Sequence, residues 1–131
     1  MKYSILILFC IICLISAGCF VRIPTTSNEE MNQNVGKFGV LNRDVILVNF
    51  FMSKVAWDLE KENNLGPKQH VIRKMKKGTK IKIKSVGYRR LPHGLFYVYV
   101  CEDIESKDVF EINRDKFDAI KLEKIANPQI N

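Results

Sequence analysis

The chain has 131 residues, of which 47% are hydrophobic, 27% charged and 10% aromatic, with 7 Gly and 4 Pro. This composition excludes a disordered, collagen-like or low-complexity protein, and the length fits one domain. The 21 Lys and Arg residues outnumber the 14 Asp and Glu residues, which leaves a net charge of +7. Such a charge favours anionic surroundings or partners without identifying them.

The N-terminus has the layout of an export signal. Lys2 precedes 19 uncharged residues, 3–21, and Arg22 ends the run. Residues 5–15 are apolar throughout, without helical or strand periodicity, and residues 16–18 are small. A positive start, an apolar stretch and then small residues are typical of a secretory signal peptide.

The sequence Ser16-Ala17-Gly18-Cys19 resembles the lipobox of bacterial lipoproteins. In that family the cysteine thiol receives a diacylglyceryl group, and a signal peptidase cuts just before the cysteine. The resemblance implies that Cys19 is lipidated and that the bond between Gly18 and Cys19 is cleaved. Ala17 and Gly18 fit the family, whereas Ser16 replaces the more usual Leu. Phe20 stands where the family's inner-membrane proteins carry Asp, which implies the outer membrane if the cell has one.

Two alternatives to a lipoprotein stay open at this point, an uncleaved membrane anchor and ordinary secretion. The uncharged run has about the length of 20 apolar residues that a bilayer core requires. All three routes place the rest of the chain outside the cytoplasm. Cys10 and Cys13 form a CxxC pattern, but they lie inside the segment that processing removes, so we assign them no redox or metal role.

We divide the chain into four segments: a signal peptide (1–18), the lipidated cysteine with a flexible tether (19–34), a β-rich domain (35–125) and a tail (126–131). Residues 22–34 are polar, with almost no apolar side chains to bury, so they are expected to stay unfolded. A random coil of this length holds a domain about 20 Å from the membrane.

Strand signals dominate the domain. Apolar and polar residues alternate with period two in residues 79–86, which is the pattern of a half-buried strand. Further strands are predicted at 37–41, 45–51, 95–101, 108–112 and 118–122. A helical turn is predicted at 113–117, a short helix at 53–63, and a long hairpin loop at 89–94. Trp57 and residues 45–52 are assigned to the core.

Five or six short strands with a helical turn before the last one resemble the small SH3-like barrels of bacterial envelope proteins. We therefore predict a mainly β fold, either a small SH3-like barrel or a curled antiparallel sheet with one short helix. The alternative is an α+β open sheet against which residues 53–63 pack as a helix.

A basic segment covers residues 73–90, with nine cations in 18 residues and no acid. On a strand, alternate residues share a face, so Ile81 and Ile83 point to the core and the lysines between them point away. The candidate anion-binding residues are Lys80, Lys82, Lys84, Arg89 and Arg90. They are either a solvated strand face or a strip that binds a lipid headgroup, an anionic envelope polymer or an acidic protein. For an exported protein no nucleic acid partner is expected.

An acidic cluster follows, with four carboxylates in seven residues: Glu102, Asp103, Glu105 and Asp108. The spacing lacks the pattern of a calcium loop, so we interpret the cluster as a solvated hairpin end. The alternative is that the acidic cluster and the basic segment attract each other.

Catalytic and metal-binding patterns are weak. His70 and His93 are the two histidines, too far apart for a recognisable metal motif. Cys101 and His93 could serve as nucleophile and base, but Cys101 ends an apolar run and is interpreted as core. We expect no catalytic residue, no metal and no cofactor.

The sequence therefore predicts a membrane-anchored envelope lipoprotein that acts as a non-catalytic binding or structural module. The membrane is one partner, through the lipid on Cys19. An envelope hydrolase or an enzyme inhibitor is the alternative, and a nucleic-acid-binding module is a third hypothesis that requires the export signal to be misassigned.

Overall fold

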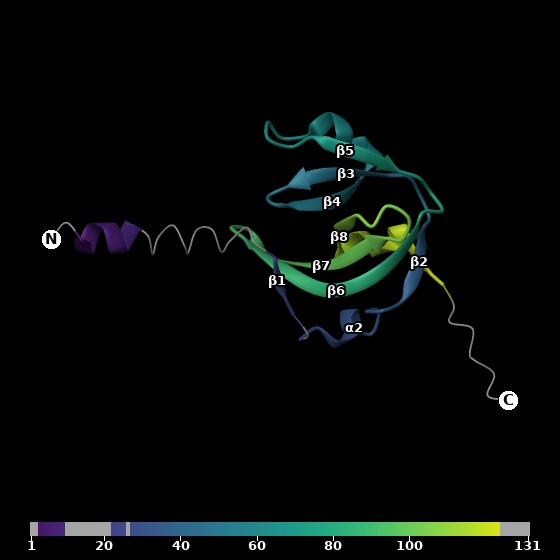
Figure 1. The fold of residues 1–131 in the computed structure, drawn as a ribbon, viewed down its shortest axis with the longest axis horizontal. Helices are drawn as coiled ribbons and strands as arrows, with labels where there is room; N and C mark the ends of the chain where they lie inside the picture. The colour runs from purple at the N-terminus through teal and green to yellow at the C-terminus, as the bar shows by residue number, and fades with distance from the viewer. Residues whose placement is uncertain (1–2, 10–21, 26, 124–131) are drawn as a thin grey trace.

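A computed structural model describes residues 3–9, 22–25 and 27–123 of the chain (Figure 1). The strands are β1 (Ile23–Pro24), β2 (Phe38–Leu41), β3 (Val45–Phe50), β4 (Ser53–Asp58), β5 (Val71–Met75), β6 (Lys80–Leu91), β7 (Gly94–Asp103), β8 (Val109–Asn113) and β9 (Ile120–Leu122). The short helices are α2 (Glu29–Asn32) and the 3-10 helices η1 (Leu59–Asn64) and η2 (Arg114–Ala119). Gly18, Cys19 and the tail 126–131 lie outside the described residues.

All nine described strands belong to one curled sheet, in the order β5-β3-β4-β8-β7-β6-β2-β9, with β1 added to the free part of the β6 edge. The prediction of a mainly β, curled-sheet domain is confirmed. The sheet is mixed rather than purely antiparallel, because β4 and β8 pair in parallel at Val55 and Glu111. In Figure 1, β3, β4 and β5 lie above the long, bent pair β6 and β7.

The largest core cluster lies on one face of this sheet and draws on almost every element, while Ile46, Val48, Val55, Val98 and Val100 are buried on the opposite face. Ile81 and Ile83 are fully buried, as their alternation with lysines predicts. The core cluster consists of Met31, Leu41, Val45, Leu47, Ala56, Met75, Ile81, Ile83, Val86, Tyr99, Cys101, Phe110, Ile112 and Ile120. Burial of such side chains stabilises the fold by about 1.5–3 kcal/mol each.

The segment predicted as a tether is partly built into the domain. Ile23 pairs with Tyr88 of β6, and Met31 of α2 is 1% exposed within the core cluster. The side chain of Asn28 caps α2 by accepting a hydrogen bond from the Met31 backbone N–H at 3.1 Å. The packed part of the chain therefore begins before residue 35, because strand pairing by β1 and burial of Met31 attach a segment that otherwise looks too polar to fold.

The helix predicted at 53–63 is wrong for its first half, and with it the α+β alternative. Residues 53–58 form β4, which pairs with β3 through Val48 and Val55 and through Ile46 and Trp57. Only η1 is helical. Pairing along a whole neighbouring strand outweighs the weak helical spacing of a few apolar residues.

Most of the other predicted strands are found at the predicted positions, but some differ from the prediction in length. β6 and β7 continue to the Leu91–Gly94 pair, so the predicted long loop at 89–94 is a two-residue turn. β5 has no counterpart among the predicted strands, because its exposed Lys74 and half-buried Arg73 hide the alternation. The strands predicted at 37–41, 45–51 and 108–112 and the helical turn at 113–117 match β2, β3, β8 and η2.

Residues 3–9 are helical, and their apolar side chains are exposed. Within the described residues, no helix combines the length and the apolar character needed to span a membrane.

Candidate functional site

The predicted anion-binding lysines lie together on β6, with most of their charge facing away from the core. Lys80 and Lys84 are exposed and Lys82 is half-buried. The Lys82 Nζ lies 5.3 Å from the centroid of the Phe38 ring, and the Lys84 Nζ lies 3.7 Å from a Glu102 carboxylate oxygen. Two of the three lysines therefore already contact groups of the protein itself.

Arg89 and Arg90 do not continue this strip. A bulge between Ile83 and Ser85 shifts the alternation of β6 by one residue. As a result Val86 joins the core, and Arg89 rather than Arg90 turns to the face that carries Glu111. Arg90 is exposed near the end of the hairpin, whereas Arg89 is buried and is not accessible to an external anion.

The Arg89–Glu111 ion pair is the most buried polar contact that we describe. Arg89 donates from Nε to Oε1 of Glu111 at 3.2 Å and from Nη2 to Oε2 at 2.6 Å. Arg89 is 5% exposed and Glu111 is 1% exposed. The guanidinium carbon lies 5.6 Å from the centroid of the Phe50 ring, and Arg22 Nη1 approaches Glu111 at 4.0 Å. The pair thus connects β6 and β8 to β3 and to the residue that precedes β1.

A small cavity of about 120 Å³ adjoins this ion pair. Its walls are Phe50, Val55, Trp57, Arg89, Leu91, Phe96, Val98, Glu111 and Asn113. Phe50 and Trp57 meet edge to face with ring centroids 6.1 Å apart. The cavity therefore brings the end of the β3–β4 hairpin next to the end of the β6–β7 hairpin.

Apolar side chains are exposed at both hairpin ends. We define the hairpin-end surface as Phe51, Met52, Leu95 and Phe96. Phe51 is 51% exposed and Met52 is 103% exposed. The prediction that residues 45–52 belong to the core is confirmed for Val45–Val48 and wrong for Phe51 and Met52, which form the turn between β3 and β4.

A second hollow of about 450 Å³ lies beside the same turn, between Asn49–Met52 and Gly66–Gln69. Asn49 holds the two segments together, because its side chain donates to the Lys68 carbonyl at 3.2 Å and accepts from the His70 N–H at 2.6 Å. These contacts place Lys68 beside the hairpin-end surface.

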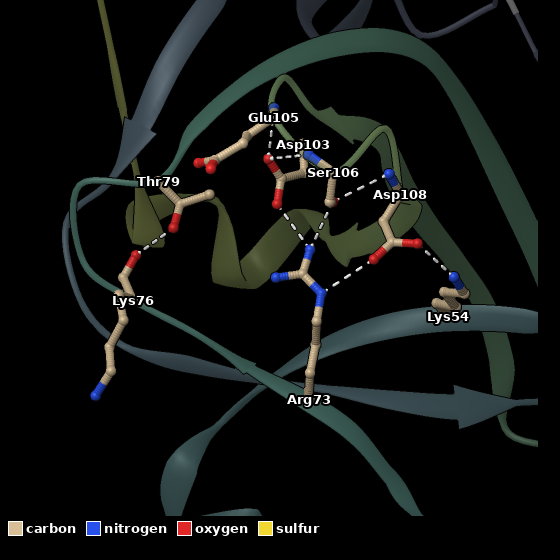
Figure 2. Close-up of polar contacts among 8 residues, drawn as sticks. All are labelled: Lys54, Arg73, Lys76, Thr79, Asp103, Glu105, Ser106 and Asp108. Atoms are coloured by element: carbon tan, nitrogen blue, oxygen red, sulfur yellow. Dashed lines mark hydrogen bonds and ion pairs between the residues drawn. The ribbon is translucent and has the colours of Figure 1, made fainter.

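Two carboxylates of the acidic cluster, Asp103 and Asp108, pair with the protein's own cations (Figure 2). Arg73 donates from Nη2 to Asp103 at 2.7 Å and from Nε to Asp108 at 3.0 Å, and the Lys54 Nζ donates to Asp108 at 2.6 Å. The Asp103 side chain also accepts from the Glu105 N–H at 2.9 Å. Arg73 belongs to the basic segment, so part of that segment does attract the acidic cluster.

These contacts lower the pKa values of the Asp103 and Asp108 carboxyl groups. Burial raises the pKa of Asp103, but hydrogen bonds from Arg73 and from the Glu105 and Ser106 backbone outweigh it, and the pKa lies below its ordinary value. The hydrogen bond from Lys54, helped by Arg73, lowers the pKa of Asp108. Both carboxylates are held ionised by partners that cross from β4 and β5 to the β7–β8 turn.

The residues considered for nucleophilic catalysis are far apart. Cys101 is completely buried, and burial raises the pKa of its thiol to about 12. His93 lies in the turn before β7, eight residues away, which is about 26 Å along a strand. In the described part of the chain, no group of three or more His, Cys, Asp or Glu residues is placed to hold a metal ion.

No family model, no curated protein and no solved structure matches this chain.

We predict that Glu111→Ala lowers the free energy of unfolding by about 3–5 kcal/mol, because it removes the carboxylate that compensates the buried Arg89 charge. Arg89→Met combined with Glu111→Leu is expected to recover most of this loss, since neither charge then remains. The measurement is urea unfolding of the three proteins.

The matched control is Asp118→Ala, which removes a carboxylate 3.0 Å from Arg43 at a position where Asp118 is 70% exposed. It is expected to cost no more than about 1 kcal/mol. Equal losses in Glu111→Ala and Asp118→Ala would contradict a special role for burial.

Arg73→Gln is predicted to lower the free energy of unfolding at pH 7 by about 1.5–3 kcal/mol, because charge-assisted hydrogen bonds to Asp103 and Asp108 are lost. Lys74→Gln is the control, since its exposed Nζ makes a single ion pair with Glu62 at 3.3 Å.

The pH dependence of the free energy of unfolding separates the contribution of charge from that of packing. The two lowered pKa values stabilise the fold above the unfolded pKa of about 3.9, and this stabilisation is lost as the pH falls through the folded values. Wild type should therefore lose more stability than Arg73→Gln below about pH 4, and parallel pH profiles would refute the network.

Proposed function

We propose that this chain is a lipid-anchored protein of the cell envelope whose mature domain acts as a non-catalytic binding or structural module. The lipobox-like residues Ser16–Cys19 support the anchor. Cleavage between Gly18 and Cys19 would leave the lipidated cysteine as the first residue. The proposed location is outside the cytoplasm, on the outer membrane if the cell has one.

The observation that carries this proposal is how soon the packed chain begins after Cys19. Arg22 reaches Glu111, and Ile23 pairs with Tyr88 of β6. Three residues span at most about 11 Å, so the lipid on Cys19 would hold the domain against the bilayer rather than at the end of a long tether. Anchoring at this distance gives the domain a high effective concentration toward any envelope partner.

The alternatives have less support. A hydrolase with a cysteine nucleophile requires an accessible thiolate, and the Cys101 thiol is buried with a pKa raised to about 12. For an enzyme inhibitor or a nucleic-acid module, no contact among the described residues favours either one specifically.

The anchor is tested by the intact mass of membrane-fraction protein from the full chain and from Cys19→Ser. We expect wild type to lack residues 1–18 and to carry a diacylglyceryl group, and Cys19→Ser to lack both changes. Cys13→Ser is the matched control, because it removes a thiol from the same apolar run and should be processed normally. An unprocessed, unlipidated wild-type mass in the membrane would indicate an anchor helix and contradict the proposal.

The candidate binding face for a partner in the aqueous phase is the basic strip of β6, which consists of Lys80, Lys82 and Lys84. Lys80 and Lys84 begin β6, and Leu91 ends it at the hairpin where the chain enters the domain. Lys84 is seven residues, or about 23 Å along the strand, from Leu91. That distance exceeds the Debye length of about 8 Å at physiological salt, so an anionic polymer or an acidic protein fits the strip better than headgroups of the anchoring membrane.

Polyphosphate is the probe for this face. Lys80→Gln with Lys82→Gln is expected to weaken polyphosphate binding by about 5- to 30-fold, at roughly 1 kcal/mol per lysine. Lys61→Gln with Arg114→Gln removes the same charge from exposed positions in η1 and η2 and should have a much smaller effect. Equal weakening in both pairs would show that net charge alone, and not the strip, determines binding.

A further inference from the structure

The turn between β3 and β4 has an unusual sequence for its conformation. Phe50 pairs with Ser53, so Phe51 and Met52 are the two turn residues, and their φ angles are 38° and 46°. Left-handed values at both positions define a turn that normally carries Asn-Gly, and bulky residues there are strained. Phe51 packs edge to face against Phe50 with ring centroids 4.6 Å apart, whereas Met52 is 103% exposed, so packing within the domain does not explain Met52. Strain of this kind is typical of functional positions.

This turn lies at the same end of the molecule as the point where the chain enters the domain. Ile23 pairs with Tyr88 and Pro24 with Gly87, so the chain before Ile23 points toward Leu91 and the β6–β7 turn. Phe50 contacts Arg89 of that hairpin. Figure 1 shows the connected ends of both hairpins on the same side as β1.

The exposed segments at this end carry positive charge, and the Glu111 carboxylate nearby is buried against Arg89. These segments are residues 49–53, 66–70 and 90–96, and they contain Lys68 and Arg90 but no Asp or Glu. Exposed aromatic and aliphatic side chains flanked by cations are the composition of surfaces that lie in a membrane interface. Each cation near an anionic membrane adds about fivefold to binding.

We infer that the hairpin-end surface docks into the bilayer that carries the lipid anchor, with Phe51 and Met52 inserted at the headgroup–acyl boundary and Lys68 and Arg90 against anionic headgroups. This inference rests on the lipid-anchored function proposed above. The three residues from Cys19 to Arg22 span at most about 11 Å, so the lipid lies close to the point where the chain enters this end of the domain, and docking needs no unfolding of β1. The basic strip at the start of β6 is then left free in the aqueous phase.

The experiment measures immersion depth in the full, lipidated chain. Nitroxide labels are attached to Met52→Cys and, as the matched control at the far end of β7, to Glu105→Cys. Cys101 is completely buried and stays unlabelled. The proteins are reconstituted into vesicles of phosphatidylethanolamine and phosphatidylglycerol, and accessibility to oxygen and to a nickel chelate is compared. We expect the Met52→Cys label to lie about 5–10 Å inside the headgroup boundary and the Glu105→Cys label to be aqueous.

A second variant separates docking from folding. Phe51→Asn with Met52→Gly supplies the residues that the turn prefers, so Tm should rise by at least about 4 °C while the apolar side chains are lost. A label on His93→Cys at the neighbouring hairpin end then reports the position of the domain. We expect this label to be immersed in the parent and aqueous in the variant. An unchanged depth would overturn the inference.

The outcomes distinguish this inference from the proposed function. Lipidated protein with an aqueous Met52→Cys label would refute docking and leave the anchor intact. A label shielded from both oxygen and nickel would assign the surface to a protein partner or a second copy, which also refutes docking. Intact mass on the same sample reports the anchor independently, so loss of the lipid alone would refute the proposed function.

Discussion

The register between β6 and β7 is the constraint on which the rest of the structure depends. β6 carries β7 on one edge and both β1 and β2 on the other, so it connects the N-terminal segment to the sheet. The bulge after Ile83 decides which side chains each face receives. With it, Val86 completes the core and Arg89 meets Glu111, and without it Arg89 would point into the apolar cluster. A charge in that position would cost several kcal/mol, which makes the register hard to change.

The excess of positive charge is divided among three different uses. Arg89 forms the buried pair with Glu111, and Arg73 ties the β7–β8 turn to β5 through Asp103 and Asp108. The outer lysines of β6, the cations near the hairpin ends and scattered exposed cations such as Lys61 and Arg114 remain for contacts outside the molecule. A count of charges along the chain therefore overstates the surface available to an anionic partner, because cations with buried or half-buried acceptors stabilise the domain instead.

Much of the fold is predictable from the sequence, and the failures have identifiable causes. The alternation around Ile81 and Ile83 correctly assigns β6 and its buried face, because one-sided burial imposes period two. Arg89 cannot be placed in this way, since a bulge is not visible in a single strand's pattern. Residues 53–58 contain too few apolar side chains to separate helix from strand, and pairing with β3 decides the outcome. Phe51 and Met52 extend an apolar run, and neither turn position carries Gly, Asn or Pro to mark the turn, so the run looks like core.

That last failure is informative about function. A turn without turn residues conflicts with local conformational preference, and natural sequences keep such conflicts mainly where a site requires them. Here the same two residues are exposed and lie at the end where the chain enters the domain, on segments that contain cations but no acids. A domain held only by a lipid could rotate freely about its short linker. Insertion of a second, protein-based contact at the same end would fix its orientation, so that the start of β6 points away from the membrane and toward partners in the aqueous phase.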